Sequence, residues 1–101
     1  MKIEETTQGD TTILKLSGKL LIGETDELRD KVNALVQAEK VQVLLDMAGV
    51  PYMDSGGLGE ITRCYSAVLR ANGKLRLTNI PKKIRELLVV TRLIDVLEAK
   101  D

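Results

Sequence analysis

The 101-residue sequence contains no histidine, tryptophan or phenylalanine, and it has one cysteine and two tyrosines. Without an imidazole, a serine in this chain lacks the base that common serine hydrolases use. One cysteine without histidine removes the usual ligand sets for zinc and iron–sulfur clusters, and a single cysteine cannot form a disulfide within the chain. We therefore expect no catalytic residue, no metal site and no cofactor.

The charge of the chain is also balanced, because 15 basic and 15 acidic residues give a net charge of zero. Bulk attraction to nucleic acid or to an acidic membrane does not follow, and two aromatic residues make no stacking platform for single-stranded nucleic acid. No apolar run approaches the roughly 20 residues of a membrane-spanning helix, and the start of the chain lacks the apolar stretch of a signal peptide. We expect one cytoplasmic domain over residues 1–101, with no nucleic-acid partner and no direct membrane insertion.

Hydrophobic periodicity predicts an alternation of strands and helices. Val41–Met47 is apolar on both alternations apart from Gln42 and Asp46, which is typical of a central strand covered on both faces or nearly so. Thr25 is expected to cap the first helix. The predicted fold is a single α/β domain, a mixed β-sheet with helices packed on it, in the order β-β-α-β-α-β-α-β. Strands are expected at residues 3–7, 12–20, 41–47, 74–78 and 93–98, and helices at 26–39, from 57 to a stop at 72–73, and from 81 onward.

The stretch from Pro51 to Ile61 is a glycine-rich turn between the most strand-like run and the clearest helix. This position predicts a strand-to-helix turn that exposes the hydroxyl of Ser55. The glycines remove side chains where the helix begins, so backbone N–H groups there could approach an anion. The simplest structural alternative is that Ser55 caps the helix and the glycines only permit a tight turn.

Enzymatic interpretations of Ser55 are weaker. The run Asp54–Gly57 also resembles the nucleophile region of trypsin-like proteases, and those enzymes need a histidine. The nucleophile elbow of α/β-hydrolases needs a histidine too, and it places glycine where this chain has Met53. A serine–lysine pair stays open by composition, although no lysine is near Ser55 in the sequence. A nucleotide-phosphate cradle also stays open, although no lysine follows the glycines as in the Walker pattern.

The run Met53–Gly59 reads Met-Asp-Ser-Gly-Gly-Leu-Gly. After a buried strand and before a helix, it resembles the signature of STAS domains, most closely that of bacterial anti-sigma factor antagonists. The resemblance covers nearly the whole chain in length and in the order of elements. Family members often carry a second Ser or Thr after the serine that receives phosphate, and this chain has Gly56 there.

The resemblance implies a switch rather than a reaction. The unmodified protein would bind an anti-sigma factor that is itself a serine kinase, and would so free the sigma factor. Phosphorylation of Ser55 would end this binding, and a serine phosphatase would reset it. Small subunits of lipid-transport ATPases and of stress-sensing scaffolds are alternatives within the same family. The partner-binding residues implied are Asp54, Ser55, Gly56, Gly57 and Leu58, with Gly23 from the loop at 20–25, which is expected to lie beside the motif.

Overall fold

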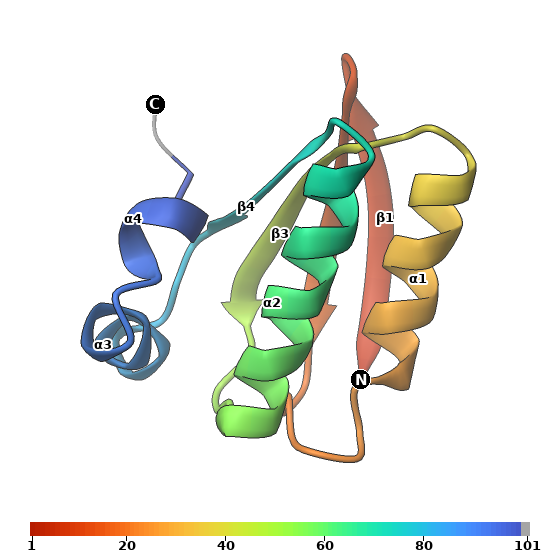
Figure 1. Cartoon of the computed structure of the whole chain (residues 1–101). Coiled ribbons are helices and arrows are strands. Elements are labelled where there is room, and N and C mark those ends of the chain that lie inside the picture. The colour runs from red at the N-terminus through yellow and green to blue at the C-terminus, as the bar shows by residue number, and fades with distance from the viewer. Residues whose placement is uncertain (100–101) are drawn as a thin grey trace.

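The computed structural model describes residues 1–99, which form a mixed four-stranded sheet and four helices (Figure 1). The strands lie in the order β1-β2-β3-β4, with β1 antiparallel to β2 and the other neighbours parallel. The first two strands, β1 and β2, follow each other in the chain and form an antiparallel pair. The elements in chain order are β1 (Lys2–Gln8), β2 (Thr11–Ser17), α1 (Asp26–Gln37), β3 (Gln42–Gly49), α2 (Ser55–Arg70), β4 (Lys74–Thr78), α3 (Lys82–Val90) and α4 (Ile94–Leu97).

The core lies between the sheet and the two helices α1 and α2, which stand on one face of it, while α3 and α4 stand beside the β4 edge (Figure 1). Alternate residues of each inner strand point to the core, since successive side chains of a strand face opposite ways. Burying each large aliphatic side chain stabilises the fold by about 1.5–3 kcal/mol. The fully buried large residues include Leu14, Leu16, Leu45, Met47, Leu75 and Leu77 from the strands and Leu28, Ile61, Ile84 and Leu88 from the helices.

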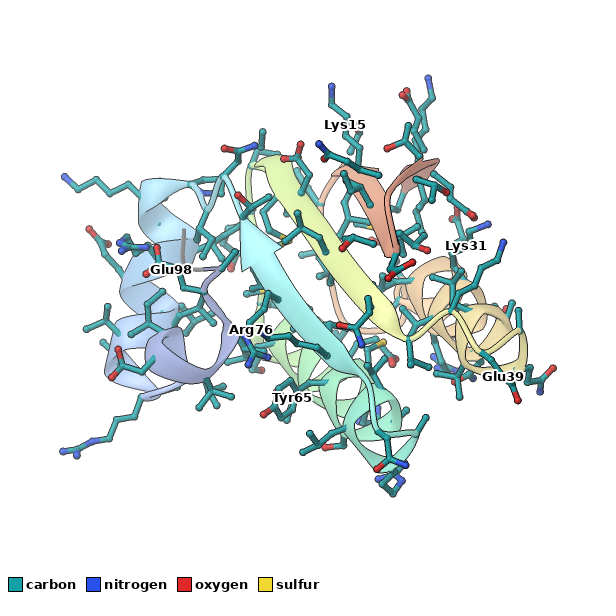
Figure 2. The ribbon with its side chains drawn as sticks, turned by 90° about the horizontal axis from the view of Figure 1, so that it is seen from above. Lys15, Lys31, Glu39, Tyr65, Arg76 and Glu98 are labelled. Carbon is teal, nitrogen blue, oxygen red and sulfur yellow. The ribbon has the colours of Figure 1, made fainter. Side chains whose placement is uncertain are left out.

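Strand β3 is central, as predicted, but its two faces, which were expected to be covered fully or nearly so, are not covered equally. Val43 and Leu45 face the helices and are buried, whereas Leu44 and Asp46 on the opposite face are partly exposed. Figure 2 shows Lys15 of the neighbouring strand β2 pointing away from α1 and α2. The polar residues Gln42 and Asp46 therefore mark the less covered face of β3.

The prediction of a strand at residues 93–98 was wrong, because the structure has the short helix α4 there. Leu97 is buried while Val96 is exposed. A short apolar run of this kind fits both the period of a strand and the period of a helix. Glu98 forms an isolated parallel bridge with Leu77 of β4. The order of elements is therefore β-β-α-β-α-β-α-α.

Two element ends also differ from the prediction. Helix α1 ends at Gln37, and Glu39 has a positive φ of 60°, which a continuing helix does not allow. Strand β2 ends at Ser17, although Leu20 beyond it remains fully buried. Helix α2 ends at Arg70, close to the predicted stop.

A buried carboxylate ties α1 to α2. Glu60 is 1% exposed, and its Oε1 accepts hydrogen bonds from the Thr25 hydroxyl at 3.0 Å, Arg29 Nε at 3.2 Å and an Arg63 guanidinium nitrogen at 3.4 Å. Burial opposes ionisation of Glu60 most strongly, but these donors together outweigh it and lower the pKa of the carboxyl. Thr25 occupies the N-cap position of α1, as predicted, but its hydroxyl bonds Glu60 instead of capping the helix.

Replacing this carboxylate should loosen the contact between the two helices. We expect Glu60→Ala to lower the free energy of unfolding by about 1–3 kcal/mol, because the Thr25 hydroxyl then lacks its buried acceptor. Glu60→Gln keeps an acceptor for Thr25 and should cost less. Urea denaturation of the three proteins measures the differences, and unchanged stability of Glu60→Ala would contradict this role.

Candidate functional site

The loop that follows β2 and the turn that follows β3 meet at one edge of the sheet. This is expected because the two strands are parallel neighbours, so their carboxyl ends lie side by side. The Leu20 N–H donates to the Tyr52 carbonyl at 3.0 Å, and the Asp54 N–H donates to the Leu20 carbonyl at 3.3 Å. Leu20 and Met53 also form an isolated parallel bridge. The loop at 20–25 thus lies directly beside the glycine-rich turn.

Asp54 fixes this junction through its side chain. Its carboxylate accepts a hydrogen bond from the Gly57 N–H at 2.9 Å, which makes Asp54 the N-cap of α2. Both carboxylate oxygens also accept from the Ile22 N–H at 3.0 Å. The bond from Ile22, followed by the one from Gly57, lowers the pKa of Asp54, because both donors favour the charged form.

Ser55 is the first residue of α2, so the sequence alternative in which it caps the helix does not hold. Its side chain is exposed, and within residues 1–99 its hydroxyl has no hydrogen-bond partner. The positive end of the helix dipole lies at this position, where a negative group is favoured. The hydroxyl is therefore exposed at a helix end whose dipole favours a negative group.

The glycines of the turn serve packing more than anion access. A Cβ built on Gly56 would lie 2.4 Å from Ile22 Cβ, and one built on Gly57 would lie 2.2 Å from the Leu20 carbonyl oxygen. Gly59 differs, because the nearest atom to such a Cβ is an Arg63 guanidinium nitrogen at 4.0 Å. Two of the three glycines thus allow the loop after β2 to lie against the start of α2. Of the N–H groups expected to be available to an anion, that of Gly57 donates to the Asp54 carboxylate instead.

The other residues predicted for partner binding differ in exposure. Gly23 is exposed and has a φ of 79°, a conformation that favours glycine. Gly57 and Leu58 are buried, so any effect that they have on a partner is through the shape of the turn. On the strand side of the motif, Met53 is buried, whereas Tyr52 is 50% exposed.

Sequence reasoning missed two residues that shape this site. Ile22 gave no periodic signal, and the hint was an apolar residue inside a loop next to Gly23. Glu60 was overlooked because acidic residues on a helix are usually solvated. Its hint was its place directly before Ile61, next to the apolar stripe of the helix.

Other kinds of chemistry find little support. The Cys64 thiol is buried, and burial, followed by the charge of Glu60, raises its pKa to about 12, so it is not a reactive thiolate. Within residues 1–99, no three acidic or cysteine side chains form a group that could hold a metal ion. No helix in this part of the chain is long and apolar enough to cross a membrane.

The order of elements, the mixed sheet and the serine at the start of α2 agree with a known class of domain. Residues 2–101 match the family model of the STAS domain, and the chain belongs to this family. Within the family, it is distantly related over its whole length to anti-sigma factor antagonists.

Particular relatives make this concrete. The chain is 26% identical to the anti-sigma-B factor antagonist of Staphylococcus aureus over 101 residues, which is all of this chain and 94% of that protein. Its fold is similar to that of an anti-sigma factor antagonist STAS domain protein from Planctomyces limnophilus, with a TM-score of 0.80 and 21% identity over 97% of this chain and 91% of the other. It is also similar to the Bacillus cell fate determinant SpoIIAA in its phosphorylated form, with a TM-score of 0.75 and 17% identity over 99% of this chain and 93% of the other.

The hydrogen bonds of Asp54 predict how substitutions at this position change the stability of the fold. Asp54→Ala should lower the midpoint of thermal unfolding more than Asp54→Asn, because asparagine still accepts an amide hydrogen bond at the N-cap. The folded pKa of Asp54 lies below its ordinary value of 3.8, so the carboxylate stabilises the fold above that value. This stabilisation is lost as the pH falls through the folded pKa. The difference in unfolding midpoint between wild type and Asp54→Asn should therefore be constant from neutral pH to about pH 5 and shrink below pH 3.8. A difference in midpoint that does not change with pH would show that the charge of Asp54 does not stabilise the fold.

Proposed function

We propose that this protein is an anti-sigma factor antagonist whose binding is switched off by phosphorylation of Ser55. The observation that carries the proposal is the exposed, unpartnered hydroxyl at the first position of α2, in a turn that Asp54 holds in place. The unphosphorylated form binds an anti-sigma factor that is a serine kinase and so frees the sigma factor. A separate serine phosphatase restores the binding form. The protein acts in the cytoplasm as a binding switch and catalyses no reaction itself.

The physical basis of the switch is charge at a surface that must lose its water on binding. A phosphate adds about −1.5 to −2 charges at neutral pH. Within the domain the positive end of the α2 dipole favours this charge, although the neighbouring Asp54 carboxylate repels it. In a docked interface the same group must be desolvated or matched by a cation, and each mismatch of roughly 1.4 kcal/mol weakens binding tenfold. The fold survives phosphorylation, and the complex does not.

The relatives support the proposal in two ways. The whole-chain relatives in Staphylococcus are anti-sigma-B factor antagonists. SpoIIAA, a similar fold, is an anti-sigma factor antagonist with structures in unphosphorylated and phosphorylated forms. The Asp54 carboxylate argues against the nucleotide alternative, because it already accepts the Gly57 N–H that a cradled phosphate would need.

Substitutions at Ser55 test the switch. Ser55→Ala should bind the anti-sigma factor as the unmodified wild type does, and the kinase should be unable to release it. Ser55→Asp should fold normally and bind at least about tenfold more weakly, since it carries a permanent charge at the same place. Calorimetric titration against each purified anti-sigma factor kinase from the same genome measures both.

The matched control is Ser66, which lies on the same helix away from the turn. Ser66→Ala and Ser66→Asp should bind alike. Thermal unfolding of all four variants confirms that each is folded. If Ser55→Ala and Ser55→Asp bind equally well, charge at this position does not control the complex.

A further inference from the structure

Ile22 combines two properties that do not usually occur together. It is 76% exposed, yet its position is fixed by contacts on both sides of Ser55. Its N–H donates to the carboxylate of Asp54, which is the residue before Ser55. Its side chain lies over Gly56, the residue after Ser55, where a Cβ would approach Ile22 Cβ at 2.4 Å and Ile22 Cγ1 at 2.8 Å. An exposed apolar side chain is thus fixed in position directly beside the candidate phosphorylation site.

Exposure alone would not distinguish Ile22, because single exposed aliphatic residues are common on protein surfaces. Val90 on α3 is even more exposed, at 80%, and lies beside the β4 edge rather than at the turn. Ile22 is distinguished by the hydrogen bond that holds its backbone in place. The backbone of Ile22 is pinned by a charged hydrogen-bond acceptor, so the side chain has a defined place before any partner arrives, and little conformational freedom remains to be lost on binding.

We propose that Ile22 is the specificity-determining contact of the Ser55 surface. The anti-sigma factor receives this side chain in an apolar pocket next to the place where it meets the serine hydroxyl. This inference rests on the proposed function and names a residue that the motif itself does not contain. Well-packed apolar anchors near the centre of an interface commonly dominate its affinity.

The same arrangement strengthens the switch. When Ile22 is enclosed by the partner, water is excluded from the neighbouring Ser55. A phosphate there then has to be buried beside an apolar side chain, which is unfavourable without a matching cation. Ile22 therefore raises the affinity of the unmodified form and increases the penalty for the phosphorylated one.

Gly56 and Ile22 act as a pair in this account. A side chain at position 56 would meet the Ile22 Cα at 2.6 Å as well as its side chain, so the loop backbone itself would have to move. That movement would separate the Ile22 N–H from Asp54. A second hydroxyl residue in the turn and Ile22 in its present position exclude each other, which gives the glycine at position 56 a structural reason.

The first test compares Ile22→Ala with Val90→Ala, a matched truncation of an exposed β-branched residue. Calorimetric titration uses the purified anti-sigma factor kinases from the same genome. Ile22→Ala should bind at least about tenfold more weakly than wild type, and Val90→Ala within about twofold. Both should keep the wild-type unfolding midpoint, because both side chains are exposed.

The outcomes separate the two proposals. If wild type binds and Ile22→Ala binds equally well, the role of Ile22 is overturned and the proposed function stands. If wild type binds none of the kinases, the proposed function fails and this role of Ile22 falls with it.

A second test needs no partner. In Gly56→Ser, the Ile22 amide should exchange with solvent at least about tenfold faster than in wild type, since its bond to Asp54 is broken. The amide of Val68, in the buried part of α2, should keep its protection and so report that the fold is intact. An Ile22 amide that stays protected in a folded Gly56→Ser protein overturns the pairing of Gly56 with Ile22.

Discussion

The hydrogen bonds of one carboxylate organise the candidate site of this molecule. Asp54 accepts from the Gly57 amide, which starts α2, and from the Ile22 amide, which belongs to the loop after β2. This side chain, together with the backbone hydrogen bonds of Leu20, joins two segments that are distant in sequence into one surface. Because the donors are backbone groups, the arrangement fixes the chain path, and Ser55 follows from it as the exposed first residue of the helix.

The rest of the fold supports that junction. The parallel pairing of β2 and β3 brings the two segments to the same edge of the sheet, and the glycines at 56 and 57 let them approach closely. About one turn further along α2, the buried Glu60 joins that helix to Thr25, the residue at the end of the same loop. The loop is therefore held at both of its ends against one helix. We therefore expect the fold to keep its arrangement when Ser55 gains or loses a charge.

The sequence was sufficient for most of the fold, and the reasons for success and failure are physical. Long amphipathic stretches such as α1 and α2 were predicted because their period is repeated many times. The segment at 93–98 was too short to separate the two periods, and the strand predicted there is a helix. The site was only partly predictable. The motif places Ser55 at a helix start, but the contacts of Ile22, Asp54 and Glu60 join residues far apart in the chain, and no local pattern encodes such pairs.

We propose that Ser55 carries a phosphate whose occupancy changes with the state of the cell. This is tested by the intact mass of the protein isolated from its own cells in growth and under stress, with peptide mapping around Ser55. We expect one added phosphate, located on Ser55, whose occupancy differs between the two states; the Ser55→Ala protein should carry none. A protein without phosphate in either state, or with the phosphate on another residue, would show that Ser55 is not the switch.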